Sequence, residues 1–302
     1  MRETLYDQIA ANKRKTYFFV FVFTLILAVL GYVVVHLFNF GKTGLVVAGL
    51  FIIGYNLIIY FNADKLALIF SGATPADPEQ YQVLHNVVEE MAIAGGIPRP
   101  KVYIIDQDAP NAFATGRNPQ HAAVAATTGL LRVMNREELQ GVIAHEISHI
   151  RHYDILIMTI AGMIGGMIIL LRDVLLRSSF LFGRGRSRSR GGGRAGAIFL
   201  VVGLVVAILA PLFVALIRSA ISRQREYLAD AGGAYLTRYP QGLANALVRL
   251  KELYQPLPRA SQATAHLYIA SPFGKDRMDV ESLFSTHPPI DRRVARLKSL
   301  VL

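Results

Sequence analysis

Four long apolar segments divide the chain. They cover residues 17–38, 44–61, 155–171 and 197–217, and each has 17 to 22 residues without Asp, Glu, Lys or Arg. About 20 apolar residues in a helix cross the hydrocarbon core of a bilayer, and a helix satisfies its own backbone hydrogen bonds there. The pattern therefore predicts four transmembrane or membrane-associated helices.

The polar stretch after the first two apolar segments predicts alternating helix and strand. Apolar residues at helical spacing predict a helix that begins at Asp77 and stops at Gly95. Residues 101–106 and 122–128 are typical of short strands, and 111–116 of a turn-prone connection between them. We expect the strand at 122–128 to form the edge of a small sheet.

A helix is also predicted after Asn135. Asn135 is followed three residues later by Glu138, which is the spacing of a capping box. Apolar residues then continue the helical pattern as far as His152. This helix would carry the most informative motif of the chain.

The predicted fold class is a mainly α-helical membrane protein with an α+β domain that carries a small sheet. Its parts are an N-terminal membrane hairpin at 1–63, a first part of the polar domain at 64–154, a second hydrophobic helix pair with a Gly/Arg-rich loop (183–196) at 155–217, and a second part of the polar domain at 218–302. The polar domain is thus interrupted by membrane-associated sequence.

Composition supports a membrane protein and limits the chemistry. Of 302 residues, 53% are hydrophobic and only 18% are charged, which excludes a disordered chain. The chain has no Cys, so disulfides, thiolate zinc sites, iron–sulfur clusters and thiol catalysis are excluded. Any bound metal must be held by His, Asp or Glu.

Charge next to the apolar segments predicts orientation. Arg2 and the basic run 13–15 precede the first segment, whereas the loop after it holds only Lys42, so the N-terminus and the polar domain are expected in the cytoplasm. Residues 172–196 hold seven Arg and one Asp, although two complete crossings would place them outside. Either the rule that Arg-rich and Lys-rich loops stay in the cytoplasm fails for this loop, or residues 155–217 enter the membrane and return to the same side.

The same arginines explain part of the formal net charge of +11. The loop at 183–196 has no interleaved aromatic residue and belongs to no nucleic-acid-binding pattern, so no nucleic-acid partner is expected. Attraction to anionic lipid headgroups is the favoured interpretation. A membrane-anchored nucleic-acid binder is the weaker alternative.

An HExxH motif lies on the helix after Asn135. Residues i and i+4 project from one face of a helix about one turn apart, so His145 and His149 suit two neighbouring ligands of one zinc ion. Glu146 projects beside them, where it can act as general base toward a zinc-bound water. A catalytic zinc needs a third protein ligand.

The third ligand is sought after the fourth apolar segment. Glu226 is the candidate ligand, and Asp230, one turn later, could accept a hydrogen bond from the second ring nitrogen of a zinc-bound His. A solvated helix face remains the alternative for Glu226 on spacing alone, because Arg223 and Arg225 flank it.

Four motifs in this order resemble a known family. HEISH, a later SRQREYLAD, an upstream NAFATG and a late FSTHPP are together similar to the integral-membrane zinc metalloproteases of the heat-shock HtpX type, which are related to the CAAX prenyl protease. The resemblance covers nearly the whole chain. It implies a zincin-like (gluzincin) endopeptidase with one Zn²⁺, held by His145, His149 and Glu226, and with Glu146 as catalytic base.

The resemblance also implies a setting. The active site would face the cytoplasm of a multi-pass protein in the cell or inner membrane, where the enzyme degrades misfolded or damaged proteins under stress. Its partners would be unfolded or membrane-embedded protein substrates, the lipid bilayer, and membrane chaperones or other proteases. Physiological substrates and oligomeric state are not encoded in these motifs.

The last motif adds two candidates. The family pattern has a His-Pro-Pro and an Arg six residues after that His, which His287 and Arg293 match. His287 could donate a hydrogen bond to the oxyanion of the tetrahedral intermediate, or it could simply precede the helix that Pro288 starts. Arg293 could hold Asp230 or another buried carboxylate.

Four further residues are candidate substrate contacts. Extended peptides bind the edge of a sheet through main-chain hydrogen bonds, and small side chains leave room for them. We therefore expect Ala123 and Ala125 of the predicted edge strand, together with Asn111 and Thr115, to contact substrate. Core packing of the alanines and turn formation by Asn111 are the alternatives.

Two other functions stay open besides degradation. A processing enzyme similar to the CAAX prenyl protease is the nearer one, although that relative is expected to have more membrane spans and an enclosed chamber. An inert membrane adaptor with a structural zinc is the other, but a closed structural site would need four protein ligands.

Overall fold

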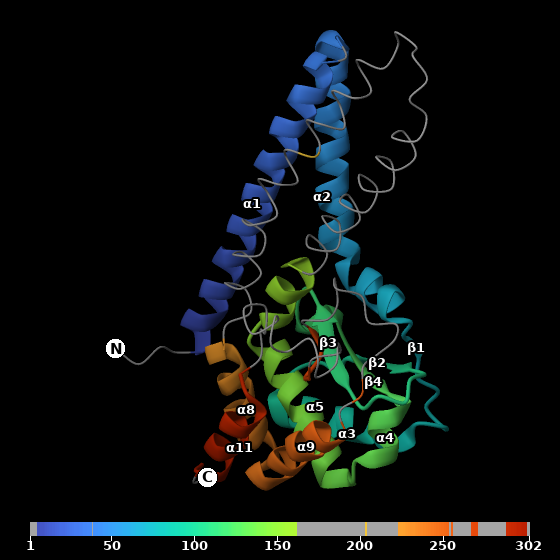
Figure 1. Cartoon of the computed structure of the whole chain (residues 1–302), viewed down its shortest axis with the longest axis vertical. Helices are drawn as coiled ribbons and strands as arrows, with labels where there is room; N and C mark the ends of the chain where they lie inside the picture. Colours follow the sequence, from blue (N-terminus) through green and yellow to red (C-terminus); the bar gives the residue numbers. More distant parts are fainter. Residues whose placement is uncertain are drawn as a thin grey trace, which may run out of the picture.

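Two long antiparallel helices rise from a region that contains the sheet and the shorter helices (Figure 1). The computed structural model describes residues 5–37, 39–161, 203, 223–253, 255, 267–270 and 288–300. The long helices are α1 (Leu5–Leu37) and α2 (Gly41–Ser71). The start of α1 and the end of α2 both adjoin the sheet-containing region. The chain therefore runs away from this region along α1 and returns to it along α2.

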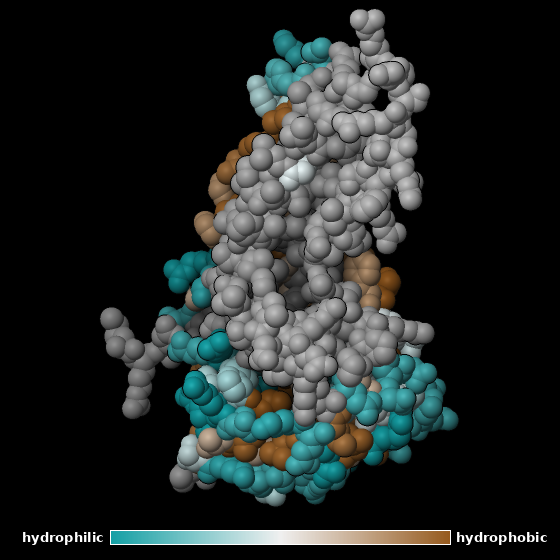
Figure 2. All heavy atoms as spheres, viewed as in Figure 1, coloured by the Kyte–Doolittle hydropathy of each residue, from teal (hydrophilic) through white to brown (hydrophobic). Residues whose placement is uncertain are grey.

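Both long helices are apolar enough to cross a membrane. The segments Ile9–Val33 and Gly41–Ser71 have mean hydropathies of 2.3 and 2.1. Many of their large side chains face outward, with Phe21 65% exposed and Phe51 69% exposed. Figure 2 shows hydrophobic surface on the hairpin and mostly hydrophilic surface on the region below it. A bilayer is the environment that would cover such helices.

The second predicted membrane pair falls largely outside the described residues. Residues 154–161 are helical and open the third apolar segment. The rest of 155–217, except residue 203, and the whole Gly/Arg-rich loop at 183–196 lie outside the described ranges. The total of four membrane helices therefore stays a prediction. Among the described residues, α1 and α2 have the length and hydropathy that a membrane helix needs.

The sheet is mixed and has four strands. They are β1 (Thr74–Pro75), β2 (Lys101–Ile105), β3 (Ala112–Gly116) and β4 (Ala122–Thr127), in the order β1-β2-β4-β3. β4 runs parallel to β2 and antiparallel to β3. The expectation that β4 is the edge strand is wrong, because β4 is bonded on both sides and β3 lies at the edge.

The interpretation of 111–116 as a turn-prone connection is wrong for a related reason. Asn and Gly at its ends and alanines within it have low strand propensity. Pairing with β4 and complete burial of all five residues of β3 override that propensity. The reversal between β3 and β4 is instead made by the short helix η1 (Pro119–His121).

The helix predicted from Asp77 begins later than expected. The Asp77 carboxylate accepts hydrogen bonds from the amides of Glu79 and Gln80, each at 2.9 Å, and so closes a separate turn. α3 (Gln82–Gly95) follows this turn and ends at Gly96, whose φ of 64° is the left-handed conformation that glycine adopts easily.

α5 (Arg136–Arg151) is the central helix of the core. Its start has the predicted capping box, in which the Glu138 amide donates to Asn135 Oδ1 at 2.8 Å and the Asn135 amide donates to Glu138 Oε2 at 3.0 Å. It packs against β3 and against α3, α8 (Arg223–Thr237) and α9 (Pro240–Glu252). α4 (Thr128–Val133) precedes it, and α11 (Ile290–Lys298) closes the described chain against α8 and α9.

Candidate metal centre

Three side chains from two helices converge at the middle of the core. His145 and His149 of α5 direct their Nε2 atoms toward each other at 3.2 Å. Glu226 of α8 brings Oε1 to 3.5 Å from His149 Nε2 and Oε2 to 3.8 Å from His145 Nε2. All three side chains are buried and could hold one metal ion.

The donor set fits zinc. Tetrahedral ligands at about 2.0–2.2 Å from a zinc ion lie about 3.3–3.6 Å from one another, which is close to the spacings between these atoms. Two imidazoles and one carboxylate are also a ligand set that catalytic zinc sites use, with a fourth position left for water. The residues present therefore fit a catalytic zinc.

Close contact between α5 and α8 brings Glu226 to the histidines. A Cβ atom added at Gly233 would lie 3.0 Å from the His145 backbone nitrogen and 3.2 Å from its Cα. Gly232 similarly faces the side chain of Ser148. This glycine pair lets the two helix backbones approach each other, and Glu226 lies two turns earlier on α8.

Each histidine has its own carboxylate on the outer ring nitrogen. His145 Nδ1 lies 3.0 Å from Asp230 Oδ1, and His149 Nδ1 lies 3.1 Å from Asp154 Oδ2. When Nδ1 donates its proton to a carboxylate, Nε2 carries the lone pair that a metal needs. Both rings are thus set in the tautomer that turns Nε2 toward the shared point.

Asp230 is in turn held by Arg293 of α11. The guanidinium donates to both oxygens of Asp230, from Nε at 2.9 Å and from Nη2 at 2.7 Å. Arg293 is completely buried, and its Nη1 also donates to the Ile269 carbonyl at 3.2 Å. Burial would raise the pKa of Asp230, but the charge of Arg293 lowers it to about 2, so this carboxylate stays ionised.

Glu146 lies beside the two histidines with its carboxylate buried. Burial raises its pKa to about 7, although the nearby His149 acts in the opposite direction. The backbone of Ala114 in β3 forms a hydrogen bond to this carboxylate and also lowers its pKa. A carboxyl group with a pKa near neutrality can both accept and release a proton at physiological pH.

The two histidines differ in their electrostatic surroundings. Burial lowers the pKa of His145 to about 4, which keeps its ring neutral. Burial alone would also lower the pKa of His149, but the Asp154 hydrogen bond and the charge of Glu226 raise it to about 9. This negative environment around His149 stabilises a positive charge at the centre, whether a proton or a metal cation.

The outer side of β3 borders the centre. The Thr127 amide donates to the Asn111 carbonyl at 2.9 Å. In an antiparallel pair, every second residue is hydrogen-bonded to the partner strand, so the main-chain groups of Ala112, Ala114 and Gly116 point away from β4. The Ala112 carbonyl accepts the Ile269 amide at 3.0 Å, and the Gly116 amide lies 3.4 Å from Thr159 Oγ1. Ala114 lies between these two contacts.

The predicted substrate contacts lie in different surroundings. The Asn111 side chain binds main chain, since Nδ2 donates to the Ala270 carbonyl at 2.9 Å and Oδ1 accepts the Ala112 amide at 3.1 Å. Thr115 is buried, with its hydroxyl 3.0 Å from that of Thr159. Ala123 and Ala125 belong to the interior strand β4, which removes the edge-strand argument for them.

His287 lies outside the described residues. Arg293, six residues later in the same motif, does reach the centre through Asp230 and lies 3.8 Å from Glu226 Oε2 through Nη1. The role of His287 as an oxyanion donor therefore stays a prediction.

One residue of the centre, Asp154, was not among the predicted site residues. It lies five residues after His149, beyond the end of α5, and its carboxylate returns to the His149 ring. An acidic residue just past an HExxH helix is a weak signal, because helical spacing does not place it near the ligands. Only the turn after α5 brings it there.

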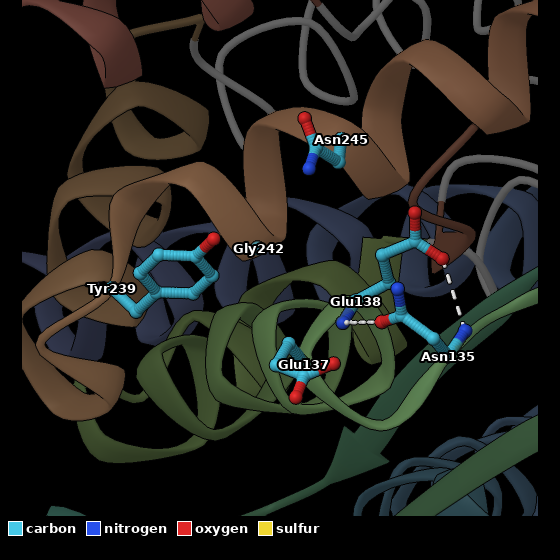
Figure 3. A pocket seen from close by; sticks show the side chains of 6 residues that line it. All are labelled: Asn135, Glu137, Glu138, Tyr239, Gly242 and Asn245. Atoms are coloured by element: carbon cyan, nitrogen blue, oxygen red, sulfur yellow. Dashed lines mark hydrogen bonds between the residues drawn. The ribbon is translucent and has the colours of Figure 1, made fainter.

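A separate surface pocket lies at the other end of α5. It has a volume of about 350 Å³ and is lined by Asn135, Glu137, Glu138, Tyr239, Gly242 and Asn245 (Figure 3). Asn135 and Glu138 are joined there by the capping-box hydrogen bonds, and Glu138 also pairs with Arg249 at 3.0 Å. These polar groups hold the helix start, about 12 Å of helical rise from the ligands.

Comparisons with known proteins agree with a protease of this kind. Residues 78–301 match the family model for Peptidase family M48. A protein named Protease HtpX homolog from Thermoanaerobacter pseudethanolicus is 57% identical over 100% of this chain and 99% of its own length. Another from Streptococcus pneumoniae serotype 4 is 47% identical over 98% of this chain and 100% of its own.

A solved structure shares the fold at lower identity. The crystal structure of S. mikatae Ste24p superposes with a TM-score of 0.51 at 21% identity, over 92% of this chain and 66% of that chain.

Proposed function

The chain belongs to peptidase family M48, and from that membership and the geometry of its metal centre we propose a membrane-bound zinc endopeptidase that degrades misfolded or damaged membrane proteins. His145, His149 and Glu226 hold one zinc ion per chain, and Glu146 is the general base. The observation that carries the proposal is the convergence of two imidazole nitrogens and the Glu226 carboxylate, with separations of 3.2–3.8 Å, beside the buried carboxylate of Glu146.

The reaction is hydrolysis of a peptide bond. Zinc, when bound, lowers the pKa of water to about 7 and polarises the peptide carbonyl. Glu146 takes the proton from the attacking water and passes it to the leaving amine. Burial favours the protonated form of Glu146 and so raises its pKa, which helps it to accept the proton from water. Asp230, held by Arg293, keeps the His145 ring in the required tautomer.

The substrate backbone lies along the outer side of β3. Ala114 has its main-chain groups turned away from β4 and next to Glu146, so an extended peptide whose amide donates to the Ala114 carbonyl would have its own carbonyl near the base. The segment 267–270 already binds β3 at Ala112, so pairing with substrate is proposed only beyond that position. Main-chain pairing gives weak sequence preference, which suits degradation of many unfolded chains.

The setting is a membrane with the centre on its cytoplasmic side. The basic run 13–15 lies at the start of α1, and α2 returns to the region that carries the metal centre. An active site next to the membrane surface can reach unfolded segments of embedded proteins as well as soluble ones. Membrane chaperones or other proteases would be natural partners in such a task.

Processing of prenylated proteins is the second candidate function. The resemblance of the sequence motifs to the CAAX prenyl protease favours it, and the fold shared with Ste24p is compatible with it. The full-length similarity to proteins named Protease HtpX homolog favours degradation instead. An inert adaptor with structural zinc is disfavoured because only three ligands converge among the described residues, with a carboxylate of raised pKa beside them.

A substrate panel separates these functions. The full chain in proteoliposomes would be given a destabilised membrane protein, the same protein in its folded form, and a farnesylated CAAX peptide. We expect zinc-dependent cleavage of the destabilised protein, much slower cleavage of the folded form, and none of the peptide. Cleavage of the peptide alone would favour processing, and no cleavage with zinc bound would favour the adaptor.

A further inference from the structure

The polar start of the first membrane helix reaches the metal centre. Asn12 of α1 lies just before the apolar segment 17–38 and is only 5% exposed. Its side-chain nitrogen donates to Asp154 Oδ1 at 2.8 Å and to the carbonyl of His152 at 2.9 Å. Both amide hydrogens of Asn12 are therefore bound to groups that follow the HExxH motif directly.

Asp154 connects this asparagine to a metal ligand. Its Oδ1 accepts from Asn12, and its Oδ2 lies 3.1 Å from Nδ1 of His149. Arg225 of α8 approaches the same carboxylate, with Nε 3.7 Å from Oδ1. Three elements, α1, α5 and α8, thus meet at one carboxylate that is 4% exposed.

The turn that presents Asp154 is one that needs support. Tyr153 has a φ of 60°, in the left-handed region that costs about 1 kcal/mol or more for a residue with a side chain. Two side chains of α1 hold this turn at the two residues before Asp154, because Asn12 binds the His152 carbonyl and Lys13 Nζ lies 4.4 Å from the centre of the Tyr153 ring.

We propose that Asn12 and Asp154 are positioning residues of the metal centre, so that the first membrane helix directly supports the ligand His149. Asp154 fixes the tautomer and direction of the His149 ring, and Asn12 fixes Asp154. The inference rests on the proposed function in one respect, namely that His145, His149 and Glu226 hold the metal. It adds that the membrane hairpin contributes to metal affinity as well as to anchoring.

The size of the effect follows from other metal sites. Loss of a hydrogen-bond partner behind a metal-bound His typically lowers metal affinity about 10–100-fold. We expect Asp154→Asn to fall in this range, because an amide cannot accept the His149 proton as strongly as a carboxylate. Asn12→Ala acts one step further away, so about a tenfold loss is expected.

The test measures metal binding and the ligand field, without reference to proteolysis. Detergent-purified full chain would be loaded with Co²⁺, and its visible absorption spectrum recorded for wild type, Asn12→Ala, Asp154→Asn and the double variant. Zn²⁺ affinity would be measured by competition with a chelator at constant pH. Thr16→Val is the matched control, because Thr16 is a buried polar residue one turn further along α1 whose hydroxyl contacts only the Asn12 carbonyl among the described hydrogen bonds.

The proposal predicts a changed Co²⁺ spectrum and weaker Zn²⁺ binding in both single variants, with Thr16→Val at the wild-type values. It also predicts that Asn12→Ala has little further effect once Asp154 is Asn, since Asn12 acts through Asp154. Wild-type affinity and spectrum in Asn12→Ala, or additive losses in the double variant, would overturn it. Failure of the wild type to bind either metal would overturn the proposed function as well.

Discussion

His145 and His149 face each other across 3.2 Å through their Nε2 atoms, while each Nδ1 atom points to a different carboxylate. The same helix thus supplies two ligands whose outer hydrogen-bond partners belong to different segments, Asp230 on α8 and Asp154 beyond the end of α5. The centre is therefore assembled from segments that are far apart in the chain, and each is sensitive to substitution in its own way.

Loss of the third ligand should remove the metal. Glu226→Ala leaves two histidines, so we expect zinc content of the purified protein to fall from about one per chain to a small fraction of that. Metal analysis after gel filtration measures this. Glu137→Ala, which removes an exposed carboxylate near the start of α5, is the control and should retain the metal. Full zinc content in Glu226→Ala would exclude this ligand.

Arg293 should matter for stability as well as for the site. Arg293→Ala leaves the buried carboxylate of Asp230 without its cation, and breaking such a pair typically destabilises a protein by about 3–5 kcal/mol. Arg293→Lys keeps the charge but loses the two-pronged hydrogen bonding, so its loss should be smaller. Thermal unfolding in detergent measures both. An unchanged unfolding temperature in Arg293→Ala would contradict the role assigned to this ion pair.

Adding one methyl group between α8 and α5 tests whether their close approach matters for zinc binding. In Gly233→Ala, the new methyl group would meet the His145 backbone at 3.0–3.2 Å, and backbone atoms of a core helix yield only if the helices separate. Glu226 would move with α8, so we expect weaker zinc binding by chelator competition. Gly54→Ala in α2 has open space around the added carbon and should bind zinc normally. Equal affinities would mean that the helix spacing is not critical.

The orientation of the chain in the membrane can be tested with single introduced cysteines, because the chain has no cysteine of its own. Lys42→Cys lies in the exposed first turn of α2, and Glu79→Cys lies in an exposed turn before α3. With a cytoplasmic metal centre, a membrane-impermeant maleimide should label Lys42→Cys in intact cells, and Glu79→Cys only after permeabilisation. The reverse pattern would place the metal centre outside the cytoplasm.

Local patterns were the most informative part of the sequence. The capping box at Asn135 and the spacing of the HExxH motif involve residues within one helix, so α5 and the common face of its histidines follow from short-range geometry. The first two apolar segments likewise predict long helices, because hydropathy over about 20 residues depends little on tertiary contacts. The helices themselves are longer than these segments, since α1 begins at Leu5 and α2 continues to Ser71.

Features that depend on distant residues were missed. β3 is a strand because β4 and segment 267–270 satisfy its two sides, which no propensity within 111–116 indicates. Asp154 reaches His149 because Tyr153 adopts a left-handed conformation, which nothing in the local sequence required. Asp77 carries the hydrogen bonds of a cap, but they close a turn that the following helix does not continue.

Replacing the general base while keeping the metal distinguishes a protease from a protein that only binds zinc. The cleavage rate of an unfolded model protein would be measured for wild type and Glu146→Gln, each shown to contain about one zinc per chain. Because general acid–base catalysis typically contributes about 10²–10⁴-fold, we expect the Glu146→Gln rate to fall by at least about 100-fold at unchanged zinc content. A rate within a few-fold of wild type would contradict the mechanism proposed for Glu146.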